Sequence, residues 1–319
     1  MRLGFAVKVL GAGGLPSHDT RRWQSEPHLS VSLDHLEAIL DYLDDTDIRF
    51  YRMATGLAPY ASHPDLTQFR DQPAACADRL AEVGALARRR GIRLTTHPGQ
   101  YTVLNSEDER IQRLAVEELE VQAELMDGMG LPPESVVVLH VGGAAGGVDA
   151  ALGRFERGFA MLSEAAQRRL VVENDDRTFA LCDVLRLSER IGRPVVWDIL
   201  HHHCNDPEDI PDREALRLAL ATWGDVHPKI HFSTPKTTVE ERKKKVGRRV
   251  ERSLVLPQLR AHADVIDPIM FEHFLRGAAA GLDFDVMLEA KAKDLALLRL
   301  RDQLAQRGLV PEGHLTTTV

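Results

Sequence analysis

Cysteine and long hydrophobic runs are both scarce in this sequence of 319 residues. The three cysteines (Cys76, Cys182 and Cys204) are odd in number and irregularly spaced, so they predict no disulfide framework. No stretch approaches the roughly 20 unbroken apolar residues of a membrane-spanning helix. The N-terminus also lacks the basic, apolar and cleavage regions of a signal peptide. We therefore expect a cytoplasmic protein with no membrane contact, and no obligate protein partner is evident.

Internal repeats and low-complexity linkers are absent as well. A chain of this length with 44% hydrophobic residues can bury a large core, and one α/β barrel with some insertions fits that length. The net charge of −8 argues mildly against non-specific binding to nucleic acid, although net charge does not describe local patches.

Apolar runs of strand length alternate with amphipathic helical stretches from end to end, which is the pattern of a parallel sheet. The predicted strands cover 2–7, 48–53, 92–97, 136–140, 169–173, 194–198, 229–233 and 285–290. The predicted helices cover 32–45, 73–91, 106–130 (with Ser106 as its N-cap), 147–166, 179–192, 213–223, 267–280 and 293–306. Eight strands with eight helices predict an α/β fold, a single (β/α)8 TIM barrel over residues 1–309. Residues 310–319 are expected to form a flexible tail.

Residues that can bind a metal stand at the ends of most of these strands. A lone histidine there is usually structural, and an unpaired carboxylate at the end of a buried strand needs a cation or several donors. Because the carboxyl ends of barrel strands share one rim, these side chains should gather in one place. They are His97, His140, Glu173, Asp198, His231 and Glu289. Histidines in segments that follow strands or inserts can reach the same rim, namely His63, His201 and His262.

So many imidazoles and carboxylates exceed the four ligands of one tetrahedral zinc site. They predict two or three divalent ions, and a mixed nitrogen and oxygen set without thiolates suits Mn²⁺ or Zn²⁺ better than Mg²⁺. Clustered metals a few ångströms apart are typical of phosphoryl transfer, in which they activate water and stabilise the leaving oxygen. Glu173 and Glu289 can bridge adjacent ions, and we expect them to matter most for catalysis.

Lys229 lies two residues before His231 on one strand, so both side chains face the same way. An ammonium group would be repelled by a cluster of cations. Three alternatives remain: Lys229 contacts a substrate phosphate, it is neutral, or it has reacted with CO₂ and become an anionic ligand.

A strongly basic stretch follows the seventh predicted strand. Residues 236–252 contain eight Lys or Arg against three Glu, within a segment, 234–262, that is too long for an ordinary strand-to-helix connection. We interpret 234–262 as an inserted functional loop and expect Lys243, Lys244 and Lys245 to contact phosphate.

Several ordered motifs resemble the UV damage endonuclease family across nearly the whole chain. They are HPGQY (97–101), LNS (104–106), LHVGG (139–143), VVEND (171–175), WDILHHH (197–203), PKIHFS (228–233), HADVI (262–266) and MLEAKAKD (287–294). The resemblance implies a TIM barrel related to endonuclease IV and a divalent-metal cluster, commonly manganese. It also implies repair of damaged double-stranded DNA by cleavage immediately 5′ to a UV photoproduct, leaving a 3′-hydroxyl and a 5′-phosphate.

The same resemblance carries roles over to individual residues. It implies the nine ligand positions given above, with Lys229 as a modified lysine. Gln100 and Tyr101 match a pair that probes the damaged duplex, where a lesion lowers the cost of unstacking. The family often has Tyr near the first strand where this chain has Phe5, so Phe5 can stack on a lesion but offers no hydroxyl.

Two other classes of protein stay open from the residues. A sugar isomerase or epimerase on the same barrel would need one or two metals and no basic insert. A protein that binds lesions without catalysis would shift damaged DNA but leave it uncut. Activity on abasic sites, as in endonuclease IV, is a further expectation.

Overall fold

The structure is a computed structural model that describes residues 1–247 and 249–309. The expected flexible tail, 310–319, lies outside the described residues. Among the helices that are described, none is long and apolar enough to cross a membrane.

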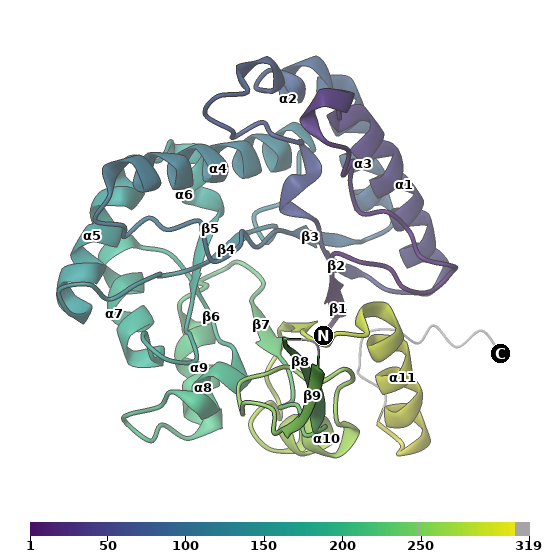
Figure 1. Ribbon diagram of the computed structural model, residues 1–319, viewed down its shortest axis with the longest axis vertical. Helices are drawn as coiled ribbons and strands as arrows, with labels where there is room; N and C mark the ends of the chain where they lie inside the picture. Colours follow the sequence, from purple (N-terminus) through teal and green to yellow (C-terminus); the bar gives the residue numbers. More distant parts are fainter. Residues whose placement is uncertain (248, 310–319) are drawn as a thin grey trace.

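Eight parallel strands form the centre of the molecule (Figure 1). They are β1 (Leu3–Ala6), β2 (Phe50–Arg52), β3 (Arg93–Thr95), β4 (Val137–His140), β5 (Leu170–Glu173), β6 (Val195–Val196), β7 (Lys229–Phe232) and β10 (Asp285–Leu288). Hydrogen bonds join them in two groups, β3-β2-β1-β10-β7 and β4-β5-β6. Isolated parallel bridges, Thr96 to Val137 and Asp198 to His231, link the groups on both sides. The strands therefore close into a ring, and the predicted TIM barrel is confirmed.

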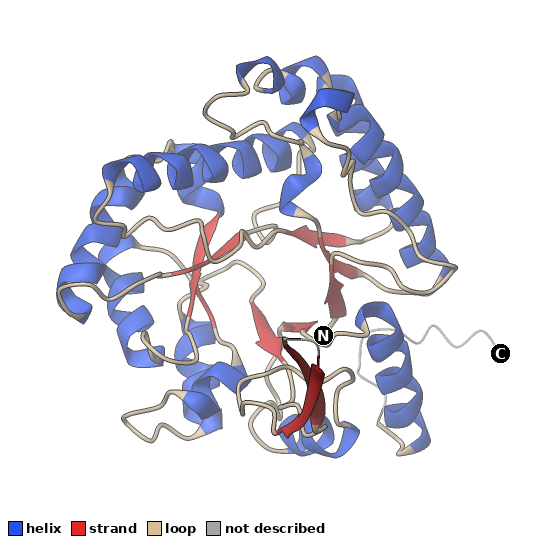
Figure 2. Ribbon diagram, in the orientation of Figure 1, coloured by secondary structure: helices blue, strands red, loops and turns tan. Residues whose placement is uncertain are grey.

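Helices surround the strands on the outside (Figure 2). The α-helices are α1 (Leu29–Asp45), α2 (Gln72–Ala75), α3 (Ala77–Arg89), α4 (Glu109–Gly128), α5 (Val148–Ala160), α6 (Glu164–Arg169), α7 (Leu181–Ile191), α8 (Ile199–Cys204), α9 (Asp212–Ala221), α10 (Pro268–Arg276) and α11 (Lys293–Gln306). Short 3-10 helices cover Trp23–Ser25, Thr55–Leu57 and Thr67–Phe69. Each predicted helix has a counterpart, although 73–91 and 147–166 are each divided in two.

The N-cap that we predicted for the helix at 106–130 is wrong. α4 begins at Glu109, and the Asp108 carboxylate accepts the backbone N–H of Arg110 at 2.8 Å. Asp108 caps better than Ser106 because its negative charge also faces the positive end of the helix dipole. The Ser106 hydroxyl instead accepts the N–H of Asp108, one turn earlier.

The predicted insert at 234–262 contains a hairpin that the sequence analysis treated as a loop. Its strands are β8 (Glu240–Val246) and β9 (Arg249–Val255), which pair with each other in antiparallel fashion. The insert is closed at its base by an antiparallel bridge between Pro235 and His262. The hairpin therefore leaves the barrel from the carboxyl end of β7.

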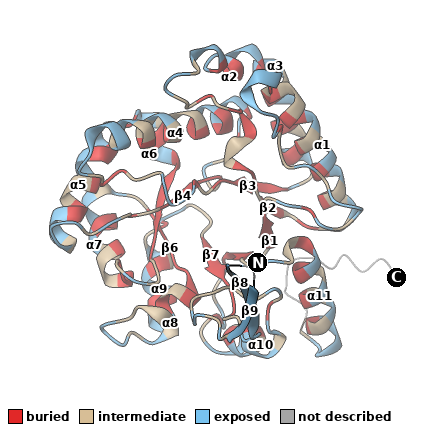
Figure 3. Cartoon of the chain, in the orientation of Figure 1, coloured by how far each residue is buried: buried red, intermediate tan, exposed pale blue. Residues whose placement is uncertain are grey.

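Alternate residues of each barrel strand face either the helices or the interior. Leu3 and Phe5 of β1 belong to the main core, which includes the buried faces of the surrounding helices. Ala6, Phe50 and Met287 form a separate apolar cluster, because they are the inward-facing residues of β1, β2 and β10. Figure 3 shows the barrel strands and the inner faces of the helices as largely buried. The interior is thus filled with side chains, and chemistry is restricted to its rim.

Candidate metal centre

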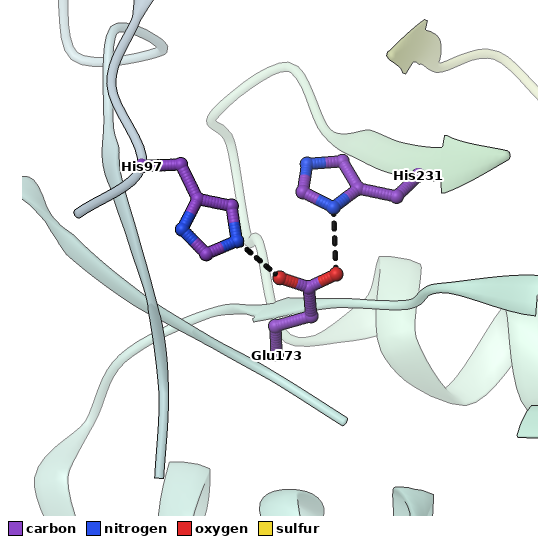
Figure 4. A group of neighbouring side chains, drawn as sticks. All are labelled: His97, Glu173 and His231. Atoms are coloured by element: carbon purple, nitrogen blue, oxygen red, sulfur yellow. Dashed lines mark hydrogen bonds and ion pairs between the residues drawn. The ribbon is translucent and has the colours of Figure 1, made fainter. Parts of the chain in front are cut away.

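Glu173, at the end of β5, is the centre of the candidate site. Its side chain is buried and receives two imidazoles from opposite sides of the barrel (Figure 4). His97 Nε2 lies 2.9 Å from Glu173 Oε2, and His231 Nδ1 lies 2.6 Å from Glu173 Oε1. His140 Nε2 is 3.5 Å from Oε2. Imidazoles at the carboxyl ends of β3, β4 and β7 therefore meet at the Glu173 carboxylate of β5.

Three overlapping groups of these side chains have ligand atoms within 4.8 Å of one another. The groups are His97, Glu173 and His231; His140, Glu173 and His201; and Asp198, His231 and Glu289. Seven of the nine predicted ligands fall within them. Because Glu173 and His231 each belong to two groups, neighbouring cations would share ligands.

His201 reaches the rim because of how α8 begins. Asp198 is the N-cap, and its Oδ1 accepts the backbone N–H of His201 at 2.8 Å. This short helix turns the His201 ring back over the strand ends, where Nδ1 lies 3.0 Å from the Asn174 carbonyl oxygen. Asn174 also exchanges two hydrogen bonds with the backbone of Asp198. This positioning role of Asn174 was not predicted from the sequence, although the residue directly follows Glu173.

Arg52 is a second residue that the sequence analysis missed. It ends β2, faces the barrel interior, and donates a short hydrogen bond from Nη1 to Glu289 Oε1. Glu289 Oε1 is also 3.5 Å from His231 Nδ1. Its place in a predicted strand was the available signal, but arginine is not a metal ligand, so the pattern of ligands at strand ends does not include it.

Burial and neighbouring charges shift the pKa values of these groups. Burial raises the pKa of Glu173, but the adjacent His231 and His140 more than offset burial and hold the pKa well below its usual value. The pKa of Glu289 is also held low, because Arg52 and His231 outweigh the effect of burial. Burial raises the pKa of Asp198. At neutral pH the site therefore holds at least two charged carboxylates.

The imidazoles differ in how readily they offer a lone pair. Burial lowers the pKa of His231 to about 4, so its ring is neutral at pH 7. Burial also lowers the pKa of His201, but the carboxylates of Asp198, Glu173 and Glu289 together raise it to about 9. His201 is therefore protonated at pH 7, and a cation that binds it must displace that proton.

Lys229 lies beneath the cluster, in the interior of the barrel. It is fully buried, and its Nζ is 2.9 Å from His231 Nε2. Burial, with Arg52 and Arg93 nearby, lowers the pKa of Lys229 well below its usual value. Of the alternatives left open by the sequence, direct contact with a substrate phosphate is the least compatible with this depth.

Two predicted ligands and one predicted contact residue lie outside the three groups. His63 accepts the backbone N–H of Asp65 through Nδ1, and its ring faces Tyr60. His262 is nearer, with Nδ1 3.6 Å from Glu289 Oε2. Phe5 has no exposed surface and packs edge-on against Tyr51 at 5.4 Å between ring centroids. Phe5 lies on the helix-facing side of β1, so its ring cannot reach a lesion, and we correct that expectation.

An open cavity of about 560 Å³ lies over the cluster. Its lining includes Arg52, His97, His140, His201, Glu289 and the loop residue Gln100. Tyr101, the next residue, is 85% exposed, which is unusual for an aromatic ring and leaves its face available for stacking. The predicted probing pair therefore stands beside the mouth of the cavity.

The chemistry of the donor set fits divalent cations. Buried polar atoms normally have partners, but Asp198 Oδ2 and His140 Nδ1 are buried without a hydrogen-bond partner among the described residues. A carboxylate oxygen left alone at the rim of an imidazole cluster is a suitable ligand atom. The cluster contains nitrogen and oxygen donors without a thiolate, the set that suits Mn²⁺ or Zn²⁺.

Comparison with known proteins identifies the family. Residues 28–313 match the model of the UV-endonuclease UvdE family. A UV DNA damage endonuclease of Bacillus velezensis is 32% identical over 297 residues, which cover 90% of this chain and 85% of that protein. The enzyme of the same name from Bacillus cereus strain G9842 is 31% identical over 282 residues, covering 87% and 82%.

Solved structures agree with this assignment. The crystal structure described as SacUVDE superposes with a TM-score of 0.79 at 30% identity, covering 97% of this chain and all of that one. A D-tagatose 3-epimerase-like protein superposes with a TM-score of 0.56 at 15% identity, covering 96% of each chain, which shows only that the fold is shared. The protein is therefore an endonuclease and belongs to the UV-endonuclease UvdE family.

Proposed function

We propose that this DNA repair endonuclease depends on two or three divalent metal ions, most suitably Mn²⁺, and cuts damaged double-stranded DNA immediately 5′ to UV photoproducts. The products would be a 3′-hydroxyl and a 5′-phosphate. Abasic sites are proposed as further substrates. The observation that supports the proposal best is the convergence of seven ligand-type side chains, Glu173 among them, in three overlapping groups.

The proposed ligands are His97, His140, Glu173, Asp198, His201, His231 and Glu289, with His63 and His262 as outer candidates. When bound there, divalent cations would activate water as a nucleophile and would offset the negative charge that develops on the leaving oxygen. The chain itself holds the site in shape: Asn174 fixes the Asp198 backbone, and Asp198 orients His201. Arg52 holds Glu289 toward His231 and faces the cavity that would receive the phosphate.

Incubation with end-labelled duplexes tests the proposal. One duplex is UV-irradiated and the other is intact, and both are treated in the presence of Mn²⁺. We expect cleavage of the irradiated duplex alone, at a position immediately 5′ to the photoproduct. Damaged DNA that shifts on a gel but stays uncut would instead support the lesion-binding protein, and cleavage 3′ to the lesion would refute the stated position.

We propose that Lys229 carries a carboxyl group derived from CO₂. The amine must be neutral to attack the carbon of CO₂, and burial favours the neutral form because it lowers the pKa of Lys229. As the new N–C bond forms, one C=O π bond opens to give a carboxylate, and the nitrogen releases one proton to solvent. The product would be an anionic ligand next to His231, in place of a cation that the metal ions would repel.

The Lys229 proposal predicts a measurable mass and a large mutational effect. Native mass spectrometry of the metal-loaded protein is expected to show one added CO₂, which acid treatment removes. The change Lys229→Met keeps the approximate length of the side chain but has no amine to react with CO₂, and should lower the nicking rate by about 10²–10³-fold, as loss of one electrostatic group does in other enzymes. An unmodified mass with full activity of Lys229→Met would exclude the modification.

Gln100 and Tyr101 are proposed to probe the damaged duplex beside the cavity, by entering the base stack where a lesion has weakened it. For Tyr101→Ala we expect affinity for UV-irradiated duplex to fall by about 5- to 150-fold, the range that corresponds to a base–aromatic stacking loss of about 1–3 kcal/mol. Affinity for intact duplex should stay the same. Fluorescence anisotropy measures both, and Tyr101→Phe, which keeps the ring, is the control. Equal losses on both duplexes would mean that Tyr101 contacts DNA without sensing damage.

The cytoplasmic location remains a prediction from the sequence. A sugar isomerase activity is not proposed, because the family assignment favours an endonuclease and the likeness to epimerases extends to the fold alone.

A further inference from the structure

The β8–β9 hairpin forms a separate two-stranded sheet that is not hydrogen-bonded to the barrel strands. Both strands are exposed along most of their length (Figure 3), and neither packs substantially on another described element. A two-stranded hairpin alone in water is marginally stable. A surface of this kind is therefore suited to a partner that completes it.

The register of the hairpin divides its side chains into two faces. Opposed residues of an antiparallel pair lie on the same side, and the side alternates along each strand. One side, here called the lysine face, contains Glu241, Lys243, Lys245, Val250, Arg252 and Leu254. The other, here called the mixed face, contains Glu240, Arg242, Lys244, Arg249, Glu251, Ser253 and Val255.

Charges are arranged differently on the two faces. On the mixed face, Lys244 is opposite Glu251, a favourable pair, and Glu240 is bonded to Lys236. On the lysine face, Lys243 is directly opposite Arg252, and both are drawn to the single carboxylate of Glu241. Like charges opposite each other destabilise a hairpin. An anion lying on the lysine face would remove that cost.

Apolar side chains stand on the same lysine face. Leu254 is 79% exposed and Val250 is 59% exposed, and Leu256 just beyond β9 is 77% exposed. A DNA groove presents base edges and methyl groups between two rows of phosphates. The cationic side chains of the lysine face suit the phosphates, and its exposed apolar side chains suit the base edges and methyl groups.

The dimensions of the hairpin also match duplex DNA. Each strand has seven residues, so at about 3.4 Å per residue it is about 24 Å long, close to seven base-pair steps. The two strands are about 5 Å apart, and with side chains they fill a major groove about 12 Å wide, which admits a two-stranded ribbon.

The base of the hairpin places it next to the metal centre. Pro235 bridges His262 there, and Lys236 donates its N–H to the Ala261 carbonyl oxygen at 2.6 Å. The His262 ring is in turn 3.6 Å from Glu289. A duplex held with its cut site over the cavity would therefore run past the hairpin.

We propose that the β8–β9 hairpin is a ribbon that enters the major groove of the substrate duplex with its lysine face. This inference rests on the proposed DNA substrate and adds a defined face and groove to it. The residues in contact with phosphate are Lys243, Lys245 and Arg252, and Leu254 lies against the base edges.

Matched double variants of the full chain test the face. Lys243→Gln with Lys245→Gln removes two charges from the lysine face, and Arg242→Gln with Arg249→Gln removes two from the mixed face. Affinity for intact duplex is measured by anisotropy at several salt concentrations without metal. We expect the lysine-face variant to bind about ten- to thirtyfold more weakly near 0.15 M salt and to lose about two units of salt slope. The mixed-face variant should change by less than about threefold.

Footprinting tests the groove. Wild-type protein should protect guanine N7 in the major groove from methylation, and the lysine-face variant should lose that protection. Equal losses in the two variants, no loss in either, or protection of adenine N3 in the minor groove would each overturn the inference. Failure of the proposed function is seen separately, because it requires only that wild-type protein leave UV-irradiated DNA uncut in Mn²⁺.

Discussion

Glu289→Gln is expected to abolish nicking of UV-irradiated DNA while DNA binding survives. Glu289 directly follows β10, and its carboxylate lies between Arg52 and His231. The amide keeps the shape of the side chain but removes its negative charge, so it neither neutralises Arg52 nor binds a cation well. We expect a loss of at least about 10²–10³-fold in the single-turnover nicking rate.

Glu134→Gln is the matched control for this variant. Glu134 precedes β4 at the opposite end of the barrel and pairs with Arg2 there, so the same chemical change is made away from the cavity. Nicking by Glu134→Gln should remain near the wild-type rate. Thermal melts of both variants exclude unfolding as the cause, and full nicking by Glu289→Gln would contradict a role for its carboxylate in the cluster.

Removal of metal is expected to eliminate nicking by the wild-type protein. After treatment with a chelator, the irradiated duplex should stay intact, and Mn²⁺ should restore cleavage. The physical reason is that the cations among the described residues lining the cavity, Arg52, Arg177 and His201, can help to neutralise the phosphate, but none of them polarises water as a divalent ion does.

Metal should also stabilise the fold, which gives a readout apart from activity. A ligand that binds only the folded state stabilises it by about 2.7 kcal/mol at a concentration 100 times its Kd. Differential scanning fluorimetry of chelated protein titrated with Mn²⁺ should therefore show a rising unfolding midpoint. The variant Asp198→Asn, which loses the buried carboxylate with an unpaired oxygen, should show a smaller rise. Unchanged melting and unchanged nicking after chelation would refute metal dependence.

The sequence was sufficient to predict the barrel and most of the site because both follow from one regularity. Buried parallel strands are apolar on both faces, so a polar residue at the end of such a run is conspicuous. His97, His140, Glu173, His231 and Glu289 were visible for this reason, and their shared position on the strands placed them at one rim. The resemblance to the family was confirmed by its model match.

What the sequence could not supply was the direction of individual side chains. Phe5 was expected at the lesion because it stands where the family often has Tyr, but its side chain lies on the helix-facing side of β1, in the main core. Arg52 looked like an ordinary strand residue until the fold brought it to Glu289. The hairpin was hidden because its alternation is basic and polar, without the apolar period that marks a half-buried strand.

The two weak seams in the ring of strands have a mechanical consequence. One seam is the isolated Thr96–Val137 bridge between β3 and β4, and the other is the isolated Asp198–His231 bridge between β6 and β7. The strands β4-β5-β6 therefore form a separate hydrogen-bonded group within the barrel. The candidate ligands sit on both sides of each seam: His97 and His140 flank the first, and Asp198 and His231 flank the second. A cation held by such a pair would cross-link the two groups of strands. The rigidity of the barrel would then depend on the same ligand atoms that serve catalysis.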